Sequence, residues 1–370
     1  MSARAILLAA GGTGGHMFPA EALARELLRR GRNVCLATDR RGRAFGDRVP
    51  EVEVHRLAAA GLAGTGLLRR AEGVLHLALG YLQARALVAR LDPALVVGFG
   101  GYASVPTVCA AQRAGLPTLL HEQNAVLGRA NRLLASRARA IAISFPRTAA
   151  LGKAAARLTG NPVRPAITAV GEQPYPSATT SLNLLILGGS QGARVFAQLI
   201  PVAVEALPPA LRARLQIAQQ CRPEDLAATQ AAYDAIGVKP VLADFFTDMA
   251  ERLAAAQLVI SRSGASTVAE LAAAGRPAIL IPYPHATDDH QTANAAAFCG
   301  GGGGWLMPEA DAAPARLAER LASLLAHPGA LALSAAAARN FGLRDAASRL
   351  ADLAEELAPA NGARPRREAA

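Results

Sequence analysis

Short apolar runs alternate with longer amphipathic segments along most of the chain. The first run, Ala5–Ala10, is followed from Pro19 by leucines at helical spacing, and Gly31 stands where a helix would end. Runs this short and this uniformly apolar are typical of strands buried on both faces of a parallel sheet. The pattern therefore predicts an α/β protein in which strands and helices alternate. The other predicted strands are Val34–Thr38, Leu95–Phe99, Thr118–His121, Ala140–Ser144, Leu182–Leu187, Gln216–Ala218, Val259–Ser261 and Ala278–Pro282.

Between the two sets of predicted strands lies Gly160–Ser181, which is rich in proline, glycine and small polar residues. This composition predicts an interdomain linker. A chain of 370 residues is long enough for two α/β domains, each with its own core. We expect an N-terminal domain over residues 1–163, a C-terminal domain over 164–340, a helix over 341–358 that packs back on the N-terminal domain, and a disordered tail over 359–370.

Three predicted strands lead into glycine-rich turns, which read "GGTGGH", "GFGGY" and "GGSQGAR". A glycine turn before a helix lets an anionic group approach backbone N–H groups at the positive end of the helix dipole. The first turn does not match the dinucleotide fingerprint G-x-G-x-x-G, because Gly12-Thr13-Gly14 is followed by Gly15 and His16. We therefore expect phosphate groups in a cleft across which the parallel sheets of two Rossmann-like domains face each other. That GT-B architecture is shared by nucleotide-sugar glycosyltransferases and some sugar-nucleotide epimerases, so the fold alone does not choose the function.

Composition and charge narrow the function classes. No apolar run reaches the roughly 18 residues of a spanning helix, and the N-terminal run is too short for a secretory signal. The cysteines Cys35, Cys109, Cys221 and Cys299 lack C-x-x-C spacing, which favours neither disulfides nor a zinc site. The net charge of +11 favours an anionic partner. Aromatic residues make up only 4%, too few for base stacking, so we expect no nucleic acid.

The segment Ser261–Ala295 carries most of the polar chemistry of the C-terminal half. A helix is predicted over Thr267–Ala274, closed by Gly275, and its N-terminus suits a diphosphate. Glu270, one turn into this helix, could reach ribose hydroxyls. The alternative is an ordinary capped helix with a glutamate on its surface.

The stretch "HATDDHQTANA" follows the next predicted strand and places several polar side chains at its carboxyl end. We interpret it as a sugar-binding loop. His285, Asp288 and His290 could instead bind a metal ion, but nucleotide-sugar enzymes that need a metal usually carry an isolated D-x-D, which this sequence lacks. The sequence therefore favours no metal site.

Six sequence motifs occur, over nearly the whole chain, in the order found in one enzyme family. Together they resemble the MurG family, GT-B enzymes of glycosyltransferase family 28. The resemblance implies transfer of N-acetylglucosamine (GlcNAc) from UDP-GlcNAc to the C4 hydroxyl of MurNAc in undecaprenyl-diphospho-MurNAc-pentapeptide (lipid I). It implies an inverting reaction that forms the β-1,4 link of lipid II for peptidoglycan, with no cofactor beyond a non-essential divalent cation. The motifs are "GGTGGHMFPA", "GFGGYASVP", "HEQNAVLGRANR", "GNPVR", "GGSQGAR" and "SRSGASTVAELAAAGRPAILIPYP…DDHQTANA".

The resemblance also implies where UDP-GlcNAc binds. Its diphosphate would lie near Ser190 and the helix start, its ribose against Glu270, and its uracil at the backbone of Phe246. The fixed cation of Arg164 suits a place beside the diphosphate, where it would stabilise charge on the departing UDP. The residues expected to bind the donor are Thr13, Gly14, Gly15, Asn124, Arg164, Ser190, Phe246, Ala265, Ser266, Thr267, Val268, Glu270, Gln291 and Asn294, the last two through sugar hydroxyls.

The N-terminal glycine turns are expected to bind the lipid-linked acceptor. His16 is the leading candidate for the general base on the C4 hydroxyl, because an imidazole titrates near neutral pH. The alternative for His16 is helix capping or diphosphate binding. Glu122 is the second candidate, although a carboxylate in such a place is more often an orienting group. The residues expected at the acceptor are Gly12, His16, Gly101, Tyr102 and His121.

An enzyme that uses a lipid-linked acceptor must act at a bilayer surface. Within Gly66–Leu91, apolar and basic residues combine into an element that could lie in a membrane interface; the alternative is a helix packed on the sheet with its arginines in solvent. We expect peripheral attachment to the anionic cytoplasmic face of the inner membrane, with other cell-wall synthesis and division proteins as further partners. The residues concerned are Arg69, Arg70, Val74, Leu75, Leu79, Leu82, Arg85 and Arg90.

Two other functions remain open at this point. One is a GT-B transferase with another lipid acceptor, such as diacylglycerol. The other is a non-catalytic subunit that binds a nucleotide-sugar. Exchange of the acceptor in an assay of UDP release separates the first from the family reaction, and turnover by the purified chain alone excludes the second.

Overall fold

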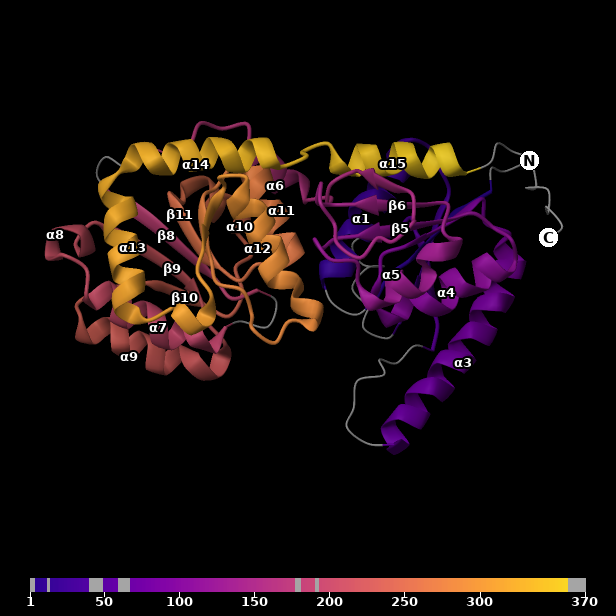
Figure 1. Cartoon of the computed structure of the whole chain (residues 1–370), viewed down its shortest axis with the longest axis horizontal. Coiled ribbons are helices and arrows are strands. Elements are labelled where there is room, and N and C mark those ends of the chain that lie inside the picture. Colours follow the sequence, from indigo (N-terminus) through magenta and orange to yellow (C-terminus); the bar gives the residue numbers. More distant parts are fainter. Residues whose placement is uncertain are drawn as a thin grey trace. The chain divides into compact units, whose positions relative to one another are not determined.

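The computed structural model describes residues 4–11, 14–39, 49–58, 67–176, 181–189 and 193–358 (Figure 1). The chain forms two compact units. Unit 1 comprises residues 1–162 and 345–370, and unit 2 comprises residues 163–344. Each unit contains one parallel sheet with helices on both faces, which confirms the predicted α/β fold.

The sheet of unit 1 has seven strands in the order β3-β2-β1-β4-β5-β6-β7, all parallel. Its strands are β1 (Ile6–Ala9), β2 (Val34–Thr38), β3 (Glu53–Arg56), β4 (Leu95–Gly98), β5 (Thr118–Glu122), β6 (Ala140–Ile143) and β7 (Ala156–Leu158). Its helices are α1 (Gly14–Arg29), α3 (Leu67–Leu91), α4 (Gly101–Arg113), α5 (Arg129–Leu134), the 3-10 turn Ala135–Arg137, and α15 (Ala346–Leu357).

Alternate residues of each central strand of this sheet enter different cores. Ile6 and Leu8 of β1 pack with α1 and α15 on one face. Leu7 and Ala9 pack with α3, α4 and α5 on the other face. Because successive side chains of a strand point to opposite faces, a run that is apolar throughout is needed to fill both cores.

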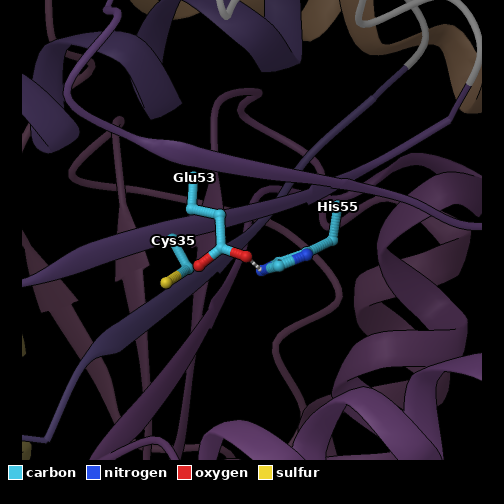
Figure 2. Close-up of side chains that lie close together, drawn as sticks. All are labelled: Cys35, Glu53 and His55. Atoms are coloured by element: carbon cyan, nitrogen blue, oxygen red, sulfur yellow. Dashed lines mark ion pairs between the residues drawn. The ribbon is translucent and has the colours of Figure 1, made fainter.

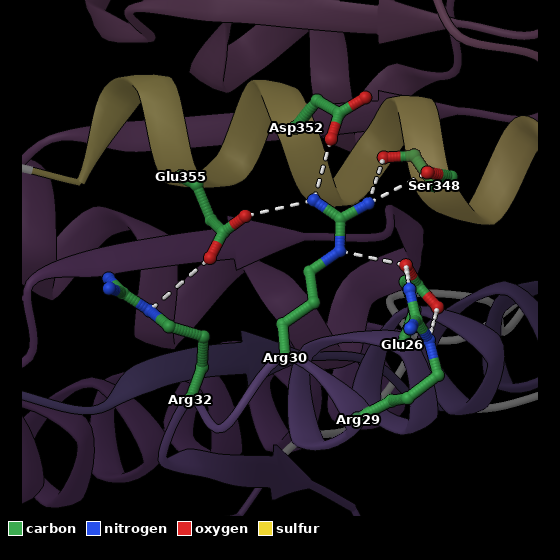
Figure 3. A network of polar contacts seen from close by, with 7 residues as sticks. All are labelled: Glu26, Arg29, Arg30, Arg32, Ser348, Asp352 and Glu355. Carbon is green, nitrogen blue, oxygen red and sulfur yellow. Dashed lines mark hydrogen bonds and ion pairs between the residues drawn. The ribbon is translucent and has the colours of Figure 1, made fainter.

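Helix α15 joins unit 1 from the far end of the sequence. Its Leu350 is fully buried in the core that contains α1. The guanidinium of Arg30, at the end of α1, lies 2.6 Å from Asp352, 2.9 Å from Glu355 and 2.7 Å from the Ser348 hydroxyl, all on α15 (Figure 3). Its Nε atom lies 2.7 Å from Glu26. Hydrogen bonds from Arg29 and Arg30 lower the pKa of Glu26 to about 2.

The sheet of unit 2 has six parallel strands in the order β10-β9-β8-β11-β12-β13. They are β8 (Leu182–Leu187), β9 (Leu215–Gln220), β10 (Val241–Ala243), β11 (Leu258–Ser261), β12 (Ala278–Leu280) and β13 (Gly304–Leu306). The helices are α6 (Pro165–Val170), α7 (Arg194–Glu205), α8 (Pro209–Arg212), α9 (Leu226–Ala235), α10 (Met249–Ala255), α11 (Ala265–Ala274), α12 (His290–Gly300), α13 (Pro314–Ala326) and α14 (Pro328–Phe341), with 3-10 turns at Pro223–Asp225, Thr287–Asp289 and Glu309–Asp311.

Three local predictions differ from the structure. Helix α1 begins at Gly14, so Pro19 lies inside the helix and Gly14 and Gly15 belong to its first turn. Helix α11 begins at Ala265, two residues before the predicted start, and Gly275 ends it in the left-handed conformation as expected. The predicted linker Gly160–Ser181 is partly helical, because α6 packs on α10 and α11 of unit 2.

No single helix among the described residues is long and apolar enough to cross a membrane. One bent pair, over residues 314–326 and 328–357, reaches that length and apolar composition only when both parts are counted together.

Candidate active site

Both sheets place a topological switch point at their centre. In unit 1 the chain passes from β1 to β2 on one side and later to β4 on the other. In unit 2 it passes from β8 to β9 on one side and later to β11 on the other. Ligands of open α/β sheets bind outside the carboxyl ends of the strands at such points. The helices that follow these strands, α1 and α4 in unit 1 and α7 and α11 in unit 2, begin there.

In unit 1 the switch point brings His16 against the start of α4. Gly100 and Gly101 have φ values of 82° and 68°, which side chains rarely adopt. A β-carbon on Gly101 would lie 3.3 Å from Nε2 of His16, and one on Gly100 would lie 3.5 Å from its Cε1. The glycines of "GFGGY" therefore let the backbone approach the imidazole of His16 closely.

The imidazole of His16 is held from its other side by Gln123, which directly follows β5. Nδ1 of His16 lies 3.1 Å from Oε1 of Gln123. The amide nitrogen of Gln123 lies 2.9 Å from Nδ1 of His121 and 3.0 Å from the carbonyl oxygen of Phe99. Sequence reasoning assigned no role to Gln123, although the period of two along a strand places it on the same face as His121.

His121 itself lies in the interior of unit 1. It is fully buried, and its Nε2 lies 3.1 Å from the carbonyl oxygen of Gly160. Burial lowers the pKa of His121 to about 4. Both ring nitrogens of His121 are hydrogen-bonded within the protein and neither is exposed, and its contact with the acceptor stays a prediction.

Glu122 organises the loop after β5. One carboxylate oxygen accepts hydrogen bonds from the backbone and side-chain nitrogens of Asn124, each at 3.1 Å. The other accepts from the backbone of Gly128 and the side chain of Asn131, each at 2.8 Å. The carboxylate is buried and both oxygens are engaged. This arrangement is typical of an orienting group and offers no oxygen to a substrate hydroxyl.

In unit 2 the loop before α11 is fixed from α12. Oε1 of Gln291 accepts hydrogen bonds from the backbone nitrogens of Ser263, at 3.2 Å, and Tyr283, at 3.0 Å. Nδ2 of Asn294 donates to the carbonyl oxygen of Ser263 at 3.0 Å, and Asn294 is fully buried. These two residues, expected at sugar hydroxyls, thus position the N-terminus of α11. The amide nitrogen of Gln291 could still donate a hydrogen bond to a sugar hydroxyl.

Arg164 and Glu270, both expected at the donor, form an ion pair within unit 2. Nε and Nη2 of Arg164 lie 3.2 and 2.9 Å from Oε1 of Glu270. Both of these contacts use the same carboxylate oxygen. Burial raises the pKa of Glu270, and the charge of Arg164 opposes that shift.

The other expected site residues are placed as follows. Ala265, Ser266, Thr267 and Val268 form the first turn of α11, where the Ser266 hydroxyl is buried and lacks a hydrogen-bond partner. The side chain of Phe246 is buried after β10, with the Arg252 guanidinium 4.0 Å from its ring centroid, while Tyr102 at the start of α4 is partly exposed. Gly12, Thr13 and Ser190 lie outside the described residues.

Among the residues that the structure describes, one group of ligand-type side chains converges: Cys35, Glu53 and His55 (Figure 2). Their ligand atoms lie within 4.8 Å of one another on neighbouring strands β2 and β3. Glu53 pairs with His55 at 3.4 Å, and the Arg90 guanidinium lies 3.5 Å from Nδ1 of His55, so its charge would oppose a bound cation. Within the described chain, His285, Asp288 and His290 form no such group.

Sequence profiles decide the family. The glycosyltransferase family 28 N-terminal domain matches residues 6–143, and the glycosyltransferase family 28 C-terminal domain matches residues 183–355. The chain belongs to glycosyltransferase family 28.

Two bacterial relatives of this family 28 glycosyltransferase carry the same name. The chain is 57% identical over 357 residues to the UDP-N-acetylglucosamine–N-acetylmuramyl-(pentapeptide) pyrophosphoryl-undecaprenol N-acetylglucosamine transferase of Rhodospirillum centenum, covering 95% of this chain and 94% of that one. It is 56% identical to the transferase of the same name from Rhodospirillum rubrum, covering 95% and 92%. The crystal structure of Acinetobacter baumannii MurG, 30% identical, superposes with a TM-score of 0.77 over 96% of this chain and all of that one. The predicted MurG resemblance and GT-B fold class are thereby confirmed.

Proposed function

We propose that this chain transfers GlcNAc from UDP-GlcNAc to the C4 hydroxyl of MurNAc in lipid I and so forms lipid II for peptidoglycan. The observation that carries the proposal is the 57% identity, over 95% of the chain, to a transferase whose name states this donor and this acceptor. The site geometry supports it, because each unit offers helix N-termini to an anionic group at its switch point.

The donor fits the carboxyl edge of the sheet of unit 2. Along this edge the strand order places the loop after β10, with Phe246, three strands away from α11, which follows β11. Neighbouring strands are about 4.8 Å apart, so the span is about 14 Å, which suits an elongated nucleotide-sugar. We assign the uracil to the β10 loop, the diphosphate to the start of α11 and the GlcNAc to the loop before α12.

Arg164 and Glu270 contact different parts of the nucleotide in this assignment. Glu270 is held by Arg164 through one oxygen, so its second oxygen can accept hydrogen bonds from the ribose. The side chain of Arg164 is 42% exposed while it holds Glu270 of α11. Its charge and the helix dipole would stabilise the negative charge that grows on UDP as the glycosidic bond breaks.

The acceptor is assigned to unit 1. Its diphosphate would approach the helix starts near His16 and Gly101, with Tyr102 at the rim. Nε2 of His16 would take the proton of the C4 hydroxyl as that oxygen attacks the anomeric carbon from the face opposite UDP. Glu122 has a supporting role, since it fixes Asn124 and the loop that carries Gln123.

Helix α3 supports attachment to a lipid surface. Its amino-terminal half extends away from the sheet of unit 1 (Figure 1). Leu75, Leu79 and Leu82 repeat at helical spacing and are 69%, 48% and 59% exposed. Arg85 and Arg90 are exposed on the same helix. We infer peripheral binding to an anionic membrane, with the leucines in the interface and the arginines at the headgroups.

A transfer assay with the purified chain tests the proposed function. UDP-GlcNAc and a lipid I analogue should give a lipid-linked disaccharide and UDP, with and without chelator, while diacylglycerol as acceptor should give none. His16→Ala should lower kcat by about 10²- to 10⁴-fold and leave the affinity for UDP nearly unchanged. His55→Ala, in the same unit but on edge strand β3, is the matched control and should behave as wild type. Near-normal turnover by His16→Ala would remove His16 from the mechanism.

A further inference from the structure

We propose that Gln123 and His121 are positioning residues that fix His16 in the tautomer with its proton on Nδ1, so that Nε2 is the basic nitrogen. This inference rests on the proposed base role of His16 and deepens it. The three side chains form one line of hydrogen bonds within unit 1, from the first turn of α1 through the end of β5 to the carbonyl oxygen of Gly160.

The direction of the line is set at its buried end. A backbone carbonyl can only accept hydrogen bonds, so Nε2 of His121, 3.1 Å from the Gly160 oxygen, must carry a hydrogen. Full burial keeps His121 neutral, consistent with its pKa of about 4. A neutral imidazole has one protonated nitrogen, and therefore Nδ1 of His121 is an acceptor.

Gln123 links His121 to His16 and fixes which atom of each pair donates the hydrogen bond. Its amide nitrogen faces Nδ1 of His121 at 2.9 Å and the carbonyl oxygen of Phe99 at 3.0 Å. Both partners are acceptors, and the Phe99 carbonyl alone excludes the flipped amide, which would bring two oxygens together. Oε1 of Gln123 must then face Nδ1 of His16, 3.1 Å away. An amide oxygen only accepts, so Nδ1 of His16 must donate.

The fixed tautomer leaves His16 ready to act as a general base. With its proton on Nδ1, the neutral His16 ring carries its lone pair on Nε2, the nitrogen that lies beside the Gly101 backbone. The opposite tautomer would present an N–H to the acceptor hydroxyl and could not take its proton. A neutral amide achieves this without placing a fixed negative charge on the ring, as a carboxylate in the same position would.

Nitrogen NMR of the full chain labelled with ¹⁵N-histidine tests the inference. Spectra are recorded about 2 pH units above the ordinary histidine pKa of about 6.5, and the His16 signals are assigned by their loss in His16→Ala. We expect wild-type His16 to be protonated at Nδ1, and Gln123→Leu to shift the proton largely to Nε2. A wild-type His16 protonated at Nε2, or a Gln123→Leu spectrum like that of wild type, would overturn the inference.

Gln112→Leu is the matched control. Gln112 is a partly buried glutamine of the same unit whose amide nitrogen donates to the carbonyl oxygen of Leu134 at 2.9 Å, away from His16. It should lose its hydrogen bonds without changing the His16 tautomer. In the transfer assay we expect Gln123→Leu to lower kcat about 10- to 100-fold at unchanged KM for UDP-GlcNAc, and Gln112→Leu to match wild type. If His16→Ala keeps full turnover, the base role fails, and the NMR result still decides the tautomer by itself.

Discussion

His121 can accept a hydrogen bond from Gln123 only while its imidazole is neutral. Its pKa is about 4 in the folded chain and about 6.5 in an unfolded one. Between these values the unfolded chain binds a proton that the folded chain does not, so the free energy of unfolding falls as the pH falls from 6.5 to 4. By this linkage the loss reaches about 2 kcal/mol at pH 5.

Urea unfolding at neutral pH and near pH 5 measures this loss. Residue 121 does not titrate in His121→Asn, so this variant should lose about 2 kcal/mol less than wild type between the two conditions. His327→Asn, which replaces an exposed histidine, should follow wild type. Equal losses in wild type and His121→Asn would mean that His121 is not held neutral by burial.

Glu270 offers a second test at a single residue. If its free oxygen binds the ribose, Glu270→Gln should weaken UDP-GlcNAc binding about 10- to 100-fold, the value of hydrogen bonds to a charged acceptor. Calorimetry should show a much smaller effect of the variant on 2′,3′-dideoxy-UDP, which lacks the hydroxyls concerned. Glu224→Gln, an exposed glutamate of unit 2, is the control. An equal loss with both nucleotides would place the Glu270 contact elsewhere.

From the sequence, roles can be proposed for residues whose chemistry is visible in their type. His16 and Glu270 could be proposed because an imidazole after a glycine turn and a carboxylate one turn into a helix suggest roles by themselves. Gln123 was missed because an amide has no reactive chemistry, and its proposed role comes from the partners on its two sides. The sequence also does not show that His121, a histidine at a strand end, is completely buried.

At the scale of elements, the central strands were predictable and the edge strands were not. All nine predicted strands occur in the structure, within a few residues. The four that were missed, β3, β7, β10 and β13, are the outermost strands of the two sheets. Their residues are exposed or half-buried, so they lack the apolar run that marks a strand covered on both faces.

The start of α1 shows tertiary contacts overriding a local signal. Proline favours the first turn of a helix, which placed the predicted start near Pro19. The structure begins α1 five residues earlier, and its first turn carries His16 to Gln123 and to the α4 start. Two glycines and an internal proline are poor helix formers, so these contacts must stabilise the added turn.

Helix α15 should be essential to the stability of unit 1. Leu350→Ala removes a fully buried side chain from the core shared with α1 and should cost about 2 to 5 kcal/mol. Leu333→Ala, on exposed α14 surface, should cost little. The single tryptophan, Trp305, belongs to unit 2, so its fluorescence follows that unit while circular dichroism follows the whole chain. We expect Leu350→Ala to shift the dichroism transition more than the fluorescence transition; no shift in either would contradict the packing of α15.

At the scale of the whole molecule, the sequence predicted two α/β units and two anion-binding edges. The chain leaves unit 1 after residue 162 and returns to it at residue 345, so unit 2 is an insertion between two parts of unit 1. Composition could indicate an anionic partner through a net charge of +11, but not where that charge acts. The exposed leucines of α3 suggest where the proposed membrane contact lies, and their exposure can be seen only in the folded structure.

Membrane attachment should therefore need both the leucines of α3 and the positive charge. The chain should sediment with phosphatidylglycerol vesicles at low salt and be released at high salt, where screening shortens the electrostatic range to about 3 Å. Leu75→Asp combined with Leu82→Asp should weaken binding at least about 10-fold, since each leucine transferred to an apolar phase contributes about 1.5 to 3 kcal/mol. Leu333→Asp combined with Val202→Asp places the same two charges on exposed apolar residues of unit 2 and should leave sedimentation nearly unchanged. If the α3 variant sediments as fully as wild type and the control, the membrane contact lies on another surface. If the α3 variant and the control both lose sedimentation, net charge alone accounts for membrane attachment.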